Sequence, residues 1–264
     1  MKIWAVANQK GGVGKTTTTA TLASELAATG KRVLCLDIDP HGSLAHYLRI
    51  DPDDEQAASL ADLFSGEVDS LAPLIHNTPW QGVSLATGGA RLATLDRHGR
   101  QGLGRVLGRV LARLADDYDF VLIDCPPTLG VLTINALAAC DLLLIPTQTE
   151  FLALKGLEGM LRTRAMVERA RGRPLDYLIV PTLFDGRTRA CRQAFETLQQ
   201  AHPDLLWPHP IPTDTKVREA AALGETLSQH AADSRAASAY RDLINHLLQN
   251  GPAPAEMPGE EVAA

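Results

Sequence analysis

Short apolar runs recur along the chain, and segments of helix-favouring composition separate most of them. The runs that we expect to form strands are Ile3–Ala7, Val33–Leu36, Val83–Ala86, Tyr118–Asp124, Leu142–Ile145 and Tyr177–Val180. Nearly continuous apolar strands are typical of sheets covered on both faces, and helices between successive strands favour parallel pairing. The pattern predicts an α/β fold with a mostly parallel, twisted sheet, right-handed crossovers and helices on both faces.

The segments between these runs predict the covering helices. We expect them at Thr19–Ala28, near Ser43–Leu48, around Ala58–Phe64, within 91–116, from Thr133 onward, up to Ala170 and at Asp233–Leu248. Residues 51–82 are otherwise a polar, acidic connection to which we assign no chemistry. The length of 264 residues fits one large domain. We therefore expect a single domain over residues 1–250, followed by a disordered tail at 251–264, which is rich in proline, glutamate and small residues.

A glycine-rich segment, Lys10–Thr17, joins the first expected strand to the first expected helix. Glycines let successive backbone N–H groups point into one concavity, and a helix amino terminus adds its positive end, so this order makes a phosphate cradle. Lys15 is placed to reach the β- and γ-phosphates of a nucleotide, and the Thr16 hydroxyl to hold Mg²⁺. A dinucleotide-binding loop is disfavoured because the third glycine of that pattern is missing. The candidate nucleotide-binding residues are Lys10, Gly11, Gly12, Val13, Gly14, Lys15, Thr16 and Thr17.

Composition and charge narrow the functional classes. The net charge of −6 argues against a nucleic-acid-binding protein that is basic throughout, but it allows a local basic patch. The four cysteines are scattered and form no C-x-x-C pair, which is typical of small buried residues in a reducing compartment. No apolar stretch is long enough to span a bilayer, and no signal peptide is visible, so we expect a cytoplasmic protein that does not bind membranes.

Arginines are concentrated in the helical segment 91–116. Leucines and valines recur there at helical spacing, with the arginines between them. A solvated face is the simpler interpretation, and a surface for an acidic partner is the alternative that the sequence leaves open. These residues are Arg91, Arg97, Arg100, Arg105, Arg109 and Arg113.

The glycine-rich loop departs from the standard phosphate-loop pattern. In this departure the chain resembles the ParA/MinD family of ATPases. The pattern G-x-x-x-x-G-K-[ST] expects glycine where this chain has Gln9, and a second lysine, Lys10, begins the loop. In that family the early lysine reaches across a nucleotide sandwich dimer to the phosphates of the partner subunit. The resemblance extends over residues 1–249 and implies a P-loop NTPase fold, ATP or ADP with Mg²⁺ as cofactors, and an ATP-bound homodimer.

Aspartates at two strand ends match further motifs of the family. Asp124 closes an apolar strand, as does the family's residue that holds Mg²⁺ through water. Asp39 matches the residue that orients the attacking water, and Asp37 the residue that supports the magnesium shell. Turn or capping roles remain open for Asp37 and Asp39. The resemblance thus implies catalytic roles for Lys10, Lys15 and Asp39, and metal-binding roles for Thr16, Asp37 and Asp124.

Later segments resemble the interface and DNA-binding regions of the family. Gln148 and Glu150 match a segment near the dimer interface, and Thr182–Thr188 matches a loop of adenine-side and interface contacts. Partitioning ATPases of the family also carry a segment comparable to Ile211–Ala220, and basic residues there bind the DNA backbone nonspecifically. The matching cationic positions are Lys216, Arg218 and Arg235. Ordinary interface or solvated cations are the alternative for all three.

The resemblance implies an ATP-driven spatial switch that positions or segregates a cellular cargo. Hydrolysis would be slow and accelerated by a cargo adaptor or another ATPase-stimulating protein. Two segments, Asp39–Gly42 and Pro212–Ala220, look most similar to ParC-type relatives that position chemotaxis arrays at cell poles. A partitioning ATPase that binds nonspecific DNA on the nucleoid is the alternative. A metabolic ATP-dependent enzyme of the same fold is a further alternative, although we find no separate acid/base or nucleophile cluster.

Overall fold

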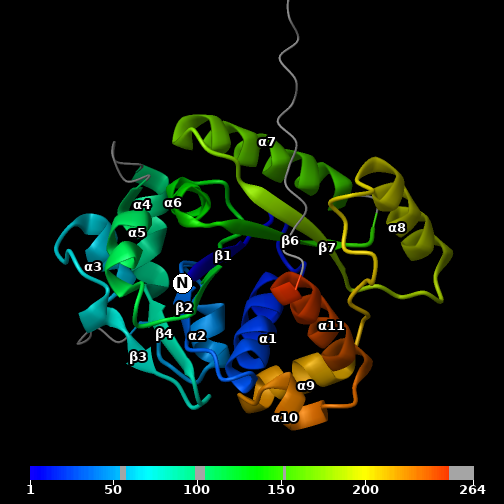
Figure 1. Ribbon diagram of the computed structural model, residues 1–264, viewed down its shortest axis with the longest axis horizontal. Coiled ribbons are helices and arrows are strands. Elements are labelled where there is room, and N and C mark those ends of the chain that lie inside the picture. The colour runs from blue at the N-terminus through cyan, green and yellow to red at the C-terminus, as the bar shows by residue number, and fades with distance from the viewer. Residues whose placement is uncertain (54–57, 99–104, 151–152, 250–264) are drawn as a thin grey trace, which may run out of the picture.

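In the computed structural model, one sheet runs through the middle of the molecule (Figure 1). The structure describes residues 1–53, 58–98, 105–150 and 153–249. The strands are β1 (Lys2–Val6), β2 (Val33–Asp37), β3 (His76–Asn77), β4 (Val83–Thr87), β5 (Phe120–Asp124), β6 (Leu142–Gln148) and β7 (Asp176–Thr182). Their order is β3-β4-β2-β5-β1-β6-β7, and only the β3–β4 pair is antiparallel. The predicted mostly parallel sheet is confirmed.

Helices cover both faces of this sheet, as predicted (Figure 1). One face packs against α3 (Leu60–Ser65), α4 (Leu92–His98), α5 (Val106–Leu111), α6 (Val131–Ala139) and α7 (Ala153–Arg171). The other packs against α1 (Lys15–Ala28), α2 (Ser43–Tyr47), α9 (Thr215–Leu223), α10 (Leu227–Ala231) and α11 (Arg235–Gln249). Beyond β7 lies α8 (Arg189–Ala201), and single 3₁₀ turns occur at Ala72–Leu74, Gly89–Arg91 and Ala112–Leu114.

Alternate strand residues supply two separate apolar cores. In β1, Trp4 and Val6 face α1, whereas Ala5 faces the layer of α3 to α7. Strand β5 divides in the same way, with Phe120 and Leu122 on the α1 side. Because both faces are buried, neither strand alternates with polar residues, which explains the continuous apolar runs in the sequence. All four cysteines are buried and unpaired, as the sequence predicts.

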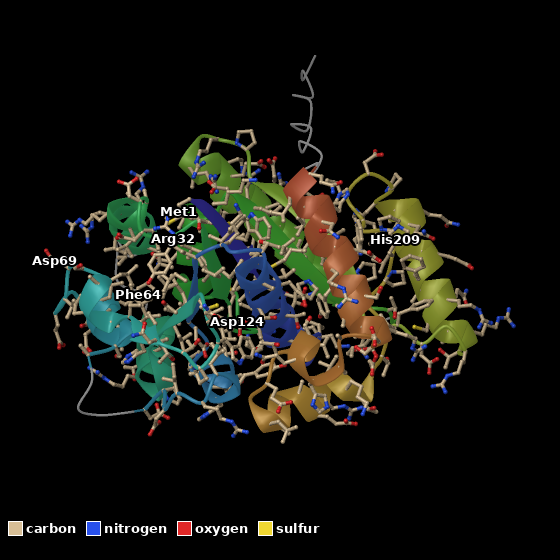
Figure 2. The ribbon with its side chains drawn as sticks, turned by 60° about the horizontal axis from the view of Figure 1, so that its bottom comes forward. Met1, Arg32, Phe64, Asp69, Asp124 and His209 are labelled. Atoms are coloured by element: carbon tan, nitrogen blue, oxygen red, sulfur yellow. The ribbon has the colours of Figure 1, made fainter. Side chains whose placement is uncertain are left out.

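The parallel strands bring their carboxyl ends to one edge of the sheet. In Figure 2, Met1 and Arg32 mark the beginnings of β1 and β2, and Asp124 marks the end of β5 inside the molecule. The register places Asp37 of β2 directly beside Asp124. The glycine-rich segment follows β1 at this same edge, so the topology gathers the predicted site residues.

Several element boundaries differ from those expected from the sequence. Helix α1 begins at Lys15 rather than Thr19, because Gly14 ends the loop and its carbonyl accepts the Thr18 N–H at 2.8 Å. The segment 91–116 is not one helix but is divided among α4, α5 and short 3₁₀ turns. Strand β6 continues through Pro146, where its pairing with β1 has already ended, so the missing proline N–H breaks no ladder bond on that side.

The predicted tail at 251–264 lies outside the described residues. Among the helices that the structure describes, none is long and apolar enough to cross a bilayer.

Candidate nucleotide-binding site

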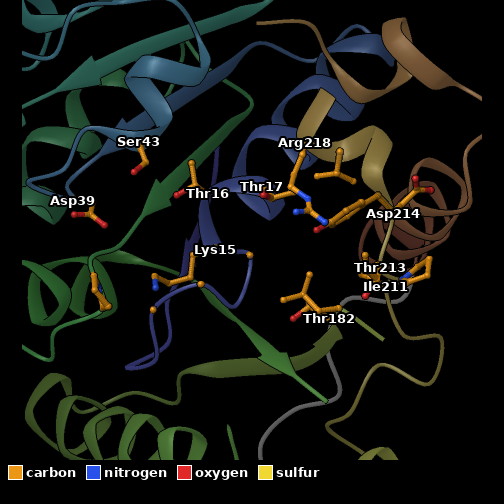
Figure 3. Close-up of a pocket in the computed structure, with 18 of the residues that line it drawn as sticks. Lys15, Thr16, Thr17, Asp39, Ser43, Thr182, Ile211, Thr213, Asp214 and Arg218 are labelled. Carbon is orange, nitrogen blue, oxygen red and sulfur yellow. The ribbon is translucent and has the colours of Figure 1, made fainter. Parts of the chain in front are cut away.

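The loop after β1 forms one wall of a cavity of about 650 Å³ (Figure 3). Gly12 and Gly14 have φ angles of 73° and 91°, in the left-handed region that favours glycine. No side chain caps the first turn of α1 within the described part of the chain, which leaves its amino-terminal N–H groups without a side-chain acceptor next to the loop. Figure 3 shows Lys15, Thr16 and Asp39 on one side of the cavity and Thr213, Asp214 and Arg218 on the other.

Lys15 places a buried positive charge beside this loop. Its ammonium donates to the Lys10 carbonyl oxygen at 3.1 Å, and the residue is 7% exposed. Burial lowers the pKa of Lys15, while the nearby carboxylates of Asp124 and Asp39 oppose that shift. A phosphate in the cradle would supply the anionic partner that this desolvated ammonium otherwise finds only in those two carboxylates.

Asp124, at the end of β5, is hydrogen-bonded to two threonines of α1. The Thr16 hydroxyl donates to Asp124 Oδ2 at 2.7 Å, and the Thr19 hydroxyl donates to Oδ1 at 3.2 Å. Burial raises the pKa of Asp124 to about 7; Asp39 adds to the rise, and the Thr16 hydrogen bond and the Lys15 charge oppose it. The contact to Thr19 was not foreseen from the sequence, although Thr19 lies one helical turn after Thr16.

This donor set fits magnesium bound together with phosphate. No group of three or more His, Cys, Asp or Glu side chains that could hold a metal occurs among the described residues. Mg²⁺ commonly uses one or two carboxylates, a hydroxyl and waters, with substrate phosphates completing its shell. Asp124 and Thr16 supply such a partial shell beside the cradle, and a cation there would relieve the cost of burying the Asp124 charge.

Asp37 lies beside Asp124 but is largely engaged by backbone groups. Its Oδ2 accepts the N–H groups of Leu44 and Ala45 at 3.0 and 2.9 Å, and its Oδ1 accepts that of Asp39 at 3.2 Å. Burial and the charge of Asp124 raise its pKa well above the usual range. These bonds are those of a residue that shapes the turn into α2, the alternative left open above. A part for Asp37 in the magnesium shell stays a prediction.

Asp39 lines the cavity and is held by His41. The backbone N–H of His41 donates to Asp39 Oδ1 at 3.0 Å, and His41 Nδ1 lies 2.9 Å from the same oxygen. Both contacts use one carboxylate oxygen, and among the described residues Oδ2 has no hydrogen-bond partner. From sequence alone, His41 reads as an ordinary loop residue. Its position two residues after the aspartate, typical of a side-chain turn, is the only available signal.

Lys10 makes its contacts away from the cavity. Its ammonium donates to Gln148 Oε1 at 3.0 Å and forms an ion pair with Glu150. The three residues that the sequence associates with a subunit interface are therefore brought together within one subunit. Lys10 does not line the cavity, which is compatible with a role on a partner's phosphates, and that role stays a prediction.

The three candidate DNA-binding cations, two on α9 and one on α11, differ in the contacts that they make. Lys216 is ion-paired with Glu219 at 2.7 Å, and Arg235 Nη2 donates to the Thr213 carbonyl oxygen at 3.4 Å. Arg218 points into the cavity from α9 (Figure 3). A continuous patch of unpaired cations is thus not what these residues form in the single chain.

The far end of the cavity consists of segments to which the sequence assigns few roles. Thr182, at the end of β7, donates its hydroxyl to the Val13 carbonyl oxygen at 2.8 Å and so ties the loop to that strand. The Tyr240 hydroxyl lies 3.0 Å from the Thr18 hydroxyl and closes the cavity from α11. Of the predicted loop Thr182–Thr188, Thr182 and Leu183 reach the cavity, whereas Asp185 forms an ion pair with Arg187.

Comparison with known proteins agrees with this geometry. Residues 1–176 match the sequence model of a family described as an AAA domain. The chain is 38% identical over 247 residues to the chromosome-partitioning ATPase Soj of Thermus thermophilus, covering 92% of this chain and 94% of that protein.

The chain is also similar to solved structures of an ATP-analogue-bound protein and of an ATPase. A Mycobacterium smegmatis protein named cobyrinic acid a,c-diamide synthase, with a bound ATP analogue and magnesium, has a TM-score of 0.80 and 34% identity. The alignment covers 97% of this chain and 100% of that one. The cell division ATPase MinD of Pyrococcus furiosus has a TM-score of 0.71 and 26% identity, with coverage of 94% and 98%.

Proposed function

The chain belongs to the ParA/MinD family of P-loop ATPases, and we propose that it hydrolyses ATP with Mg²⁺ as a dimerising switch that positions or segregates a cellular cargo. The proposal rests on one observation: Lys15, Thr16 and Asp124 lie together beside the glycine-rich loop, a cluster that we call the junction. A phosphate cradle, a buried ammonium and a hydroxyl–carboxylate pair meet at one strand edge. That combination serves phosphoryl transfer, which depends on positioning and on compensation of negative charge.

Each residue of the junction has a defined task in this proposal. Lys15 leaves the Lys10 carbonyl oxygen and binds the β- and γ-phosphates, while Thr16 and Asp124 hold the metal. Bound Mg²⁺ supplies positive charge that offsets the negative charge developing on the phosphate oxygens. Asp39, fixed through Oδ1 by His41, orients the attacking water with its other oxygen.

Lys10 makes the active unit a dimer in this proposal. To reach a partner's phosphates it must leave Gln148 and Glu150. Its ion pair is partly exposed, with 28% of the Lys10 side chain and 41% of the Glu150 side chain accessible, so breaking it costs at most about 1 kcal/mol. Contact with a partner's phosphates in a closed interface is stronger, because both groups are charged and shielded from water.

Nucleotide binding tests the proposal at its base. Titration calorimetry with Mg²⁺ and ATP should show binding by the wild type. For Lys15→Ala, which loses one charge-assisted phosphate contact, we expect binding weaker by about 10- to 100-fold. The exposed Lys31→Ala is the matched control and should bind as the wild type does. Equal affinity of the Lys15 and Lys31 variants would remove the cradle from its assigned role.

Two cargoes are supported by different observations. The segments Asp39–Gly42 and Pro212–Ala220 support the positioning of chemotaxis arrays, and the name of the Thermus relative supports chromosome partitioning. The ion pair of Lys216 with Glu219 leaves fewer free cations for DNA. Fluorescence localisation in the native cell separates the two proposals. Polar foci support array positioning, and a nucleoid distribution that Arg218→Glu abolishes supports partitioning.

A metabolic ATP-dependent enzyme is a second candidate, favoured by the name of the Mycobacterium structure. A synthase must bind an acceptor beside the γ-phosphate, and its ATP turnover then depends on that acceptor. ATP hydrolysis measured with and without cobyrinic acid and ammonia distinguishes the two functions. A switch should show no change, whereas turnover that requires the acceptor would establish the synthase.

A further inference from the structure

A second cavity lies on the face of the sheet opposite α1, between α5, α6 and α7. Its volume is about 690 Å³, similar to that of the phosphate cavity. Figure 1 shows α6 between α5 and α7, so the cavity is a groove floored by α6 and flanked by the other two helices. Nothing in the proposed ATPase cycle uses this groove.

Three arginines line the groove, and none of its lining residues in the described part of the chain is a carboxylate. Among the described residues, Arg105 and Arg109 of the α5 side have no hydrogen-bond or ion-pair partner. From the other flank, Arg171 Nη1 donates to the carbonyl oxygens of Leu137 and Cys140, both at 2.9 Å, while its buried Nε has no partner. The groove therefore carries positive charge that carboxylates of the described residues do not pair.

Other arginines of the same sequence segment behave differently. Arg91 is ion-paired with Asp62, and Arg113 Nη1 donates to the Asp69 carbonyl oxygen at 3.0 Å. The side chains of Arg97 and Arg100 lie outside the described residues. The expected solvated face is thus divided. Of the segment's four described arginine side chains, the two that line the groove stay without partners, in a chain whose net charge is −6.

Apolar side chains form the floor between these cations. Ile134 and Ala138 come from α6, Val167 comes from α7, and Gly108 of α5 adds no side chain. At the edge, Met166 is 47% exposed and is one of the few large apolar residues on the described surface. An apolar floor with an exposed methionine and a cationic rim is complementary to a helix that has an apolar stripe flanked by carboxylates. Nucleic-acid phosphates would use the arginines but would leave the apolar floor without a partner.

We propose that this groove binds an acidic amphipathic helix of a partner protein. The position of the groove suits a regulatory contact, because α6 begins directly after the segment Cys125–Gly130 that follows Asp124. In its amino-terminal half, α7 lies against the phosphate loop, where a Cβ at Gly156 would be 3.5 Å from Lys10 Cβ. The docking itself does not depend on the proposed ATPase function, and it is tested without nucleotide.

The test uses a synthetic helical peptide of about 20 residues, long enough to form a helix on binding. Leucines at positions i, i+3, i+4 and i+7 make one stripe, glutamates flank it, and fluorescein reports binding by anisotropy. The full-length protein should bind this peptide, and added NaCl should weaken the binding. For the double variant Arg105→Glu/Arg109→Glu we expect affinity reduced at least about tenfold, since two charge pairs become repulsive. Met166→Glu should also reduce it.

Matched controls separate docking from general charge effects. Lys31→Glu/Arg189→Glu changes the net charge equally at exposed positions outside the groove and should bind the peptide normally. A peptide with lysine in place of glutamate should not bind the wild type. No binding by the wild type, or equal loss in both double variants, would overturn the proposal. A duplex DNA probe bound through Arg105 and Arg109 in place of the peptide, or a nucleotide-free dimer that their substitution abolishes, would also overturn it.

Discussion

At the scale of single residues, Asp124 illustrates the cost of burying a carboxylate charge. Its carboxyl group is fully buried, and its pKa is raised to about 7, first by burial and then by the charge of Asp39. In the unfolded chain the same group titrates near 3.9. Because the folded-state pKa is the higher one, its contribution to stability is fully present below about pH 4 and is lost as the pH rises through about 7.

Replacing this carboxyl group should therefore stabilise the ligand-free protein at a pH where the group would be charged. Without nucleotide or metal, we expect Asp124→Asn to raise the free energy of unfolding at pH 8 by roughly 1–3 kcal/mol, with little gain at pH 4.5. Urea denaturation at the two pH values measures this difference. The exposed Asp116→Asn serves as the control and should change neither value. If the Asp124 variant showed the same small change at both pH values, the buried charge of Asp124 would not destabilise the folded protein.

The sequence predicted which residues meet at this site better than it predicted what each one does. Lys15, Thr16 and Asp124 could be placed because a strand, a glycine loop and a second strand end fix them at one edge. The turn-shaping bonds of Asp37 and the contact of His41 with Asp39 could not, since they depend on local backbone geometry. The pairing of Lys10 with Glu150 depends on the adjacency of β1 and β6, which strand patterns alone do not specify.

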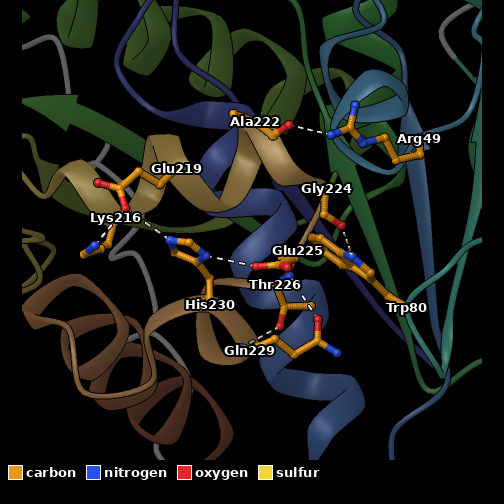
Figure 4. A network of polar contacts seen from close by, with 10 residues as sticks. All are labelled: Arg49, Trp80, Lys216, Glu219, Ala222, Gly224, Glu225, Thr226, Gln229 and His230. Carbon is orange, nitrogen blue, oxygen red and sulfur yellow. Dashed lines mark hydrogen bonds and ion pairs between the residues drawn. The ribbon is translucent and has the colours of Figure 1, made fainter.

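At the scale of elements, two hydrogen bonds join the carboxyl end of α9 to the residues Arg49 and Trp80, which lie outside the helix pair α9–α10. Figure 4 shows Trp80 Nε1 donating to the Gly224 carbonyl oxygen, at 3.0 Å, and Arg49 donating to the Ala222 carbonyl oxygen. Gly224 is the residue that ends α9, with a φ of 71°. These contacts hold α9, and with it the wall of the phosphate cavity that contains Arg218.

Truncation of Trp80 should loosen this wall. The indole is 5% exposed and packs edge-on against Tyr47 at 5.5 Å, so Trp80→Ala should cost about 3–5 kcal/mol of stability. Trp80→Phe retains most of the packing and should cost about 1 kcal/mol, the value of the hydrogen bond to Gly224. Chemical denaturation measures both. Similar small losses for the two variants would show that α9 is held by other contacts.

The same region shows the limit of element prediction from this sequence. The β-α repeats could be predicted because apolar runs and helical segments alternate in a regular way. Helices α8, α9 and α10 were not expected. Helix α10 spans only Leu227–Ala231, too short to show a helical period, whereas α9 does carry helix signals, namely three alanines and the capping residue Asp214. Strand β3 is two residues long and is held by its partner β4 rather than by its own composition.

At the scale of the whole molecule, we assign functions to two separate surfaces of the chain. The carboxyl edge of the sheet carries the phosphate cradle, and the α5–α6–α7 side carries the groove proposed for an acidic helix. The fold class followed from the order of strands and helices. The groove did not, because Arg171 is distant in sequence from Arg105 and Arg109, and the lack of carboxylate partners among the described residues is visible only in three dimensions.

Lys10 is the residue on which dimerisation of the ATP-bound chain depends in our proposal. Sedimentation velocity with Mg²⁺ and a slowly hydrolysed ATP analogue tests it, with titration calorimetry to confirm that each variant binds the nucleotide. The wild type and the exposed control Lys2→Ala should sediment as dimers. We expect Lys10→Ala to bind the nucleotide but to remain a monomer. A dimer of Lys10→Ala as stable as that of the wild type would contradict it.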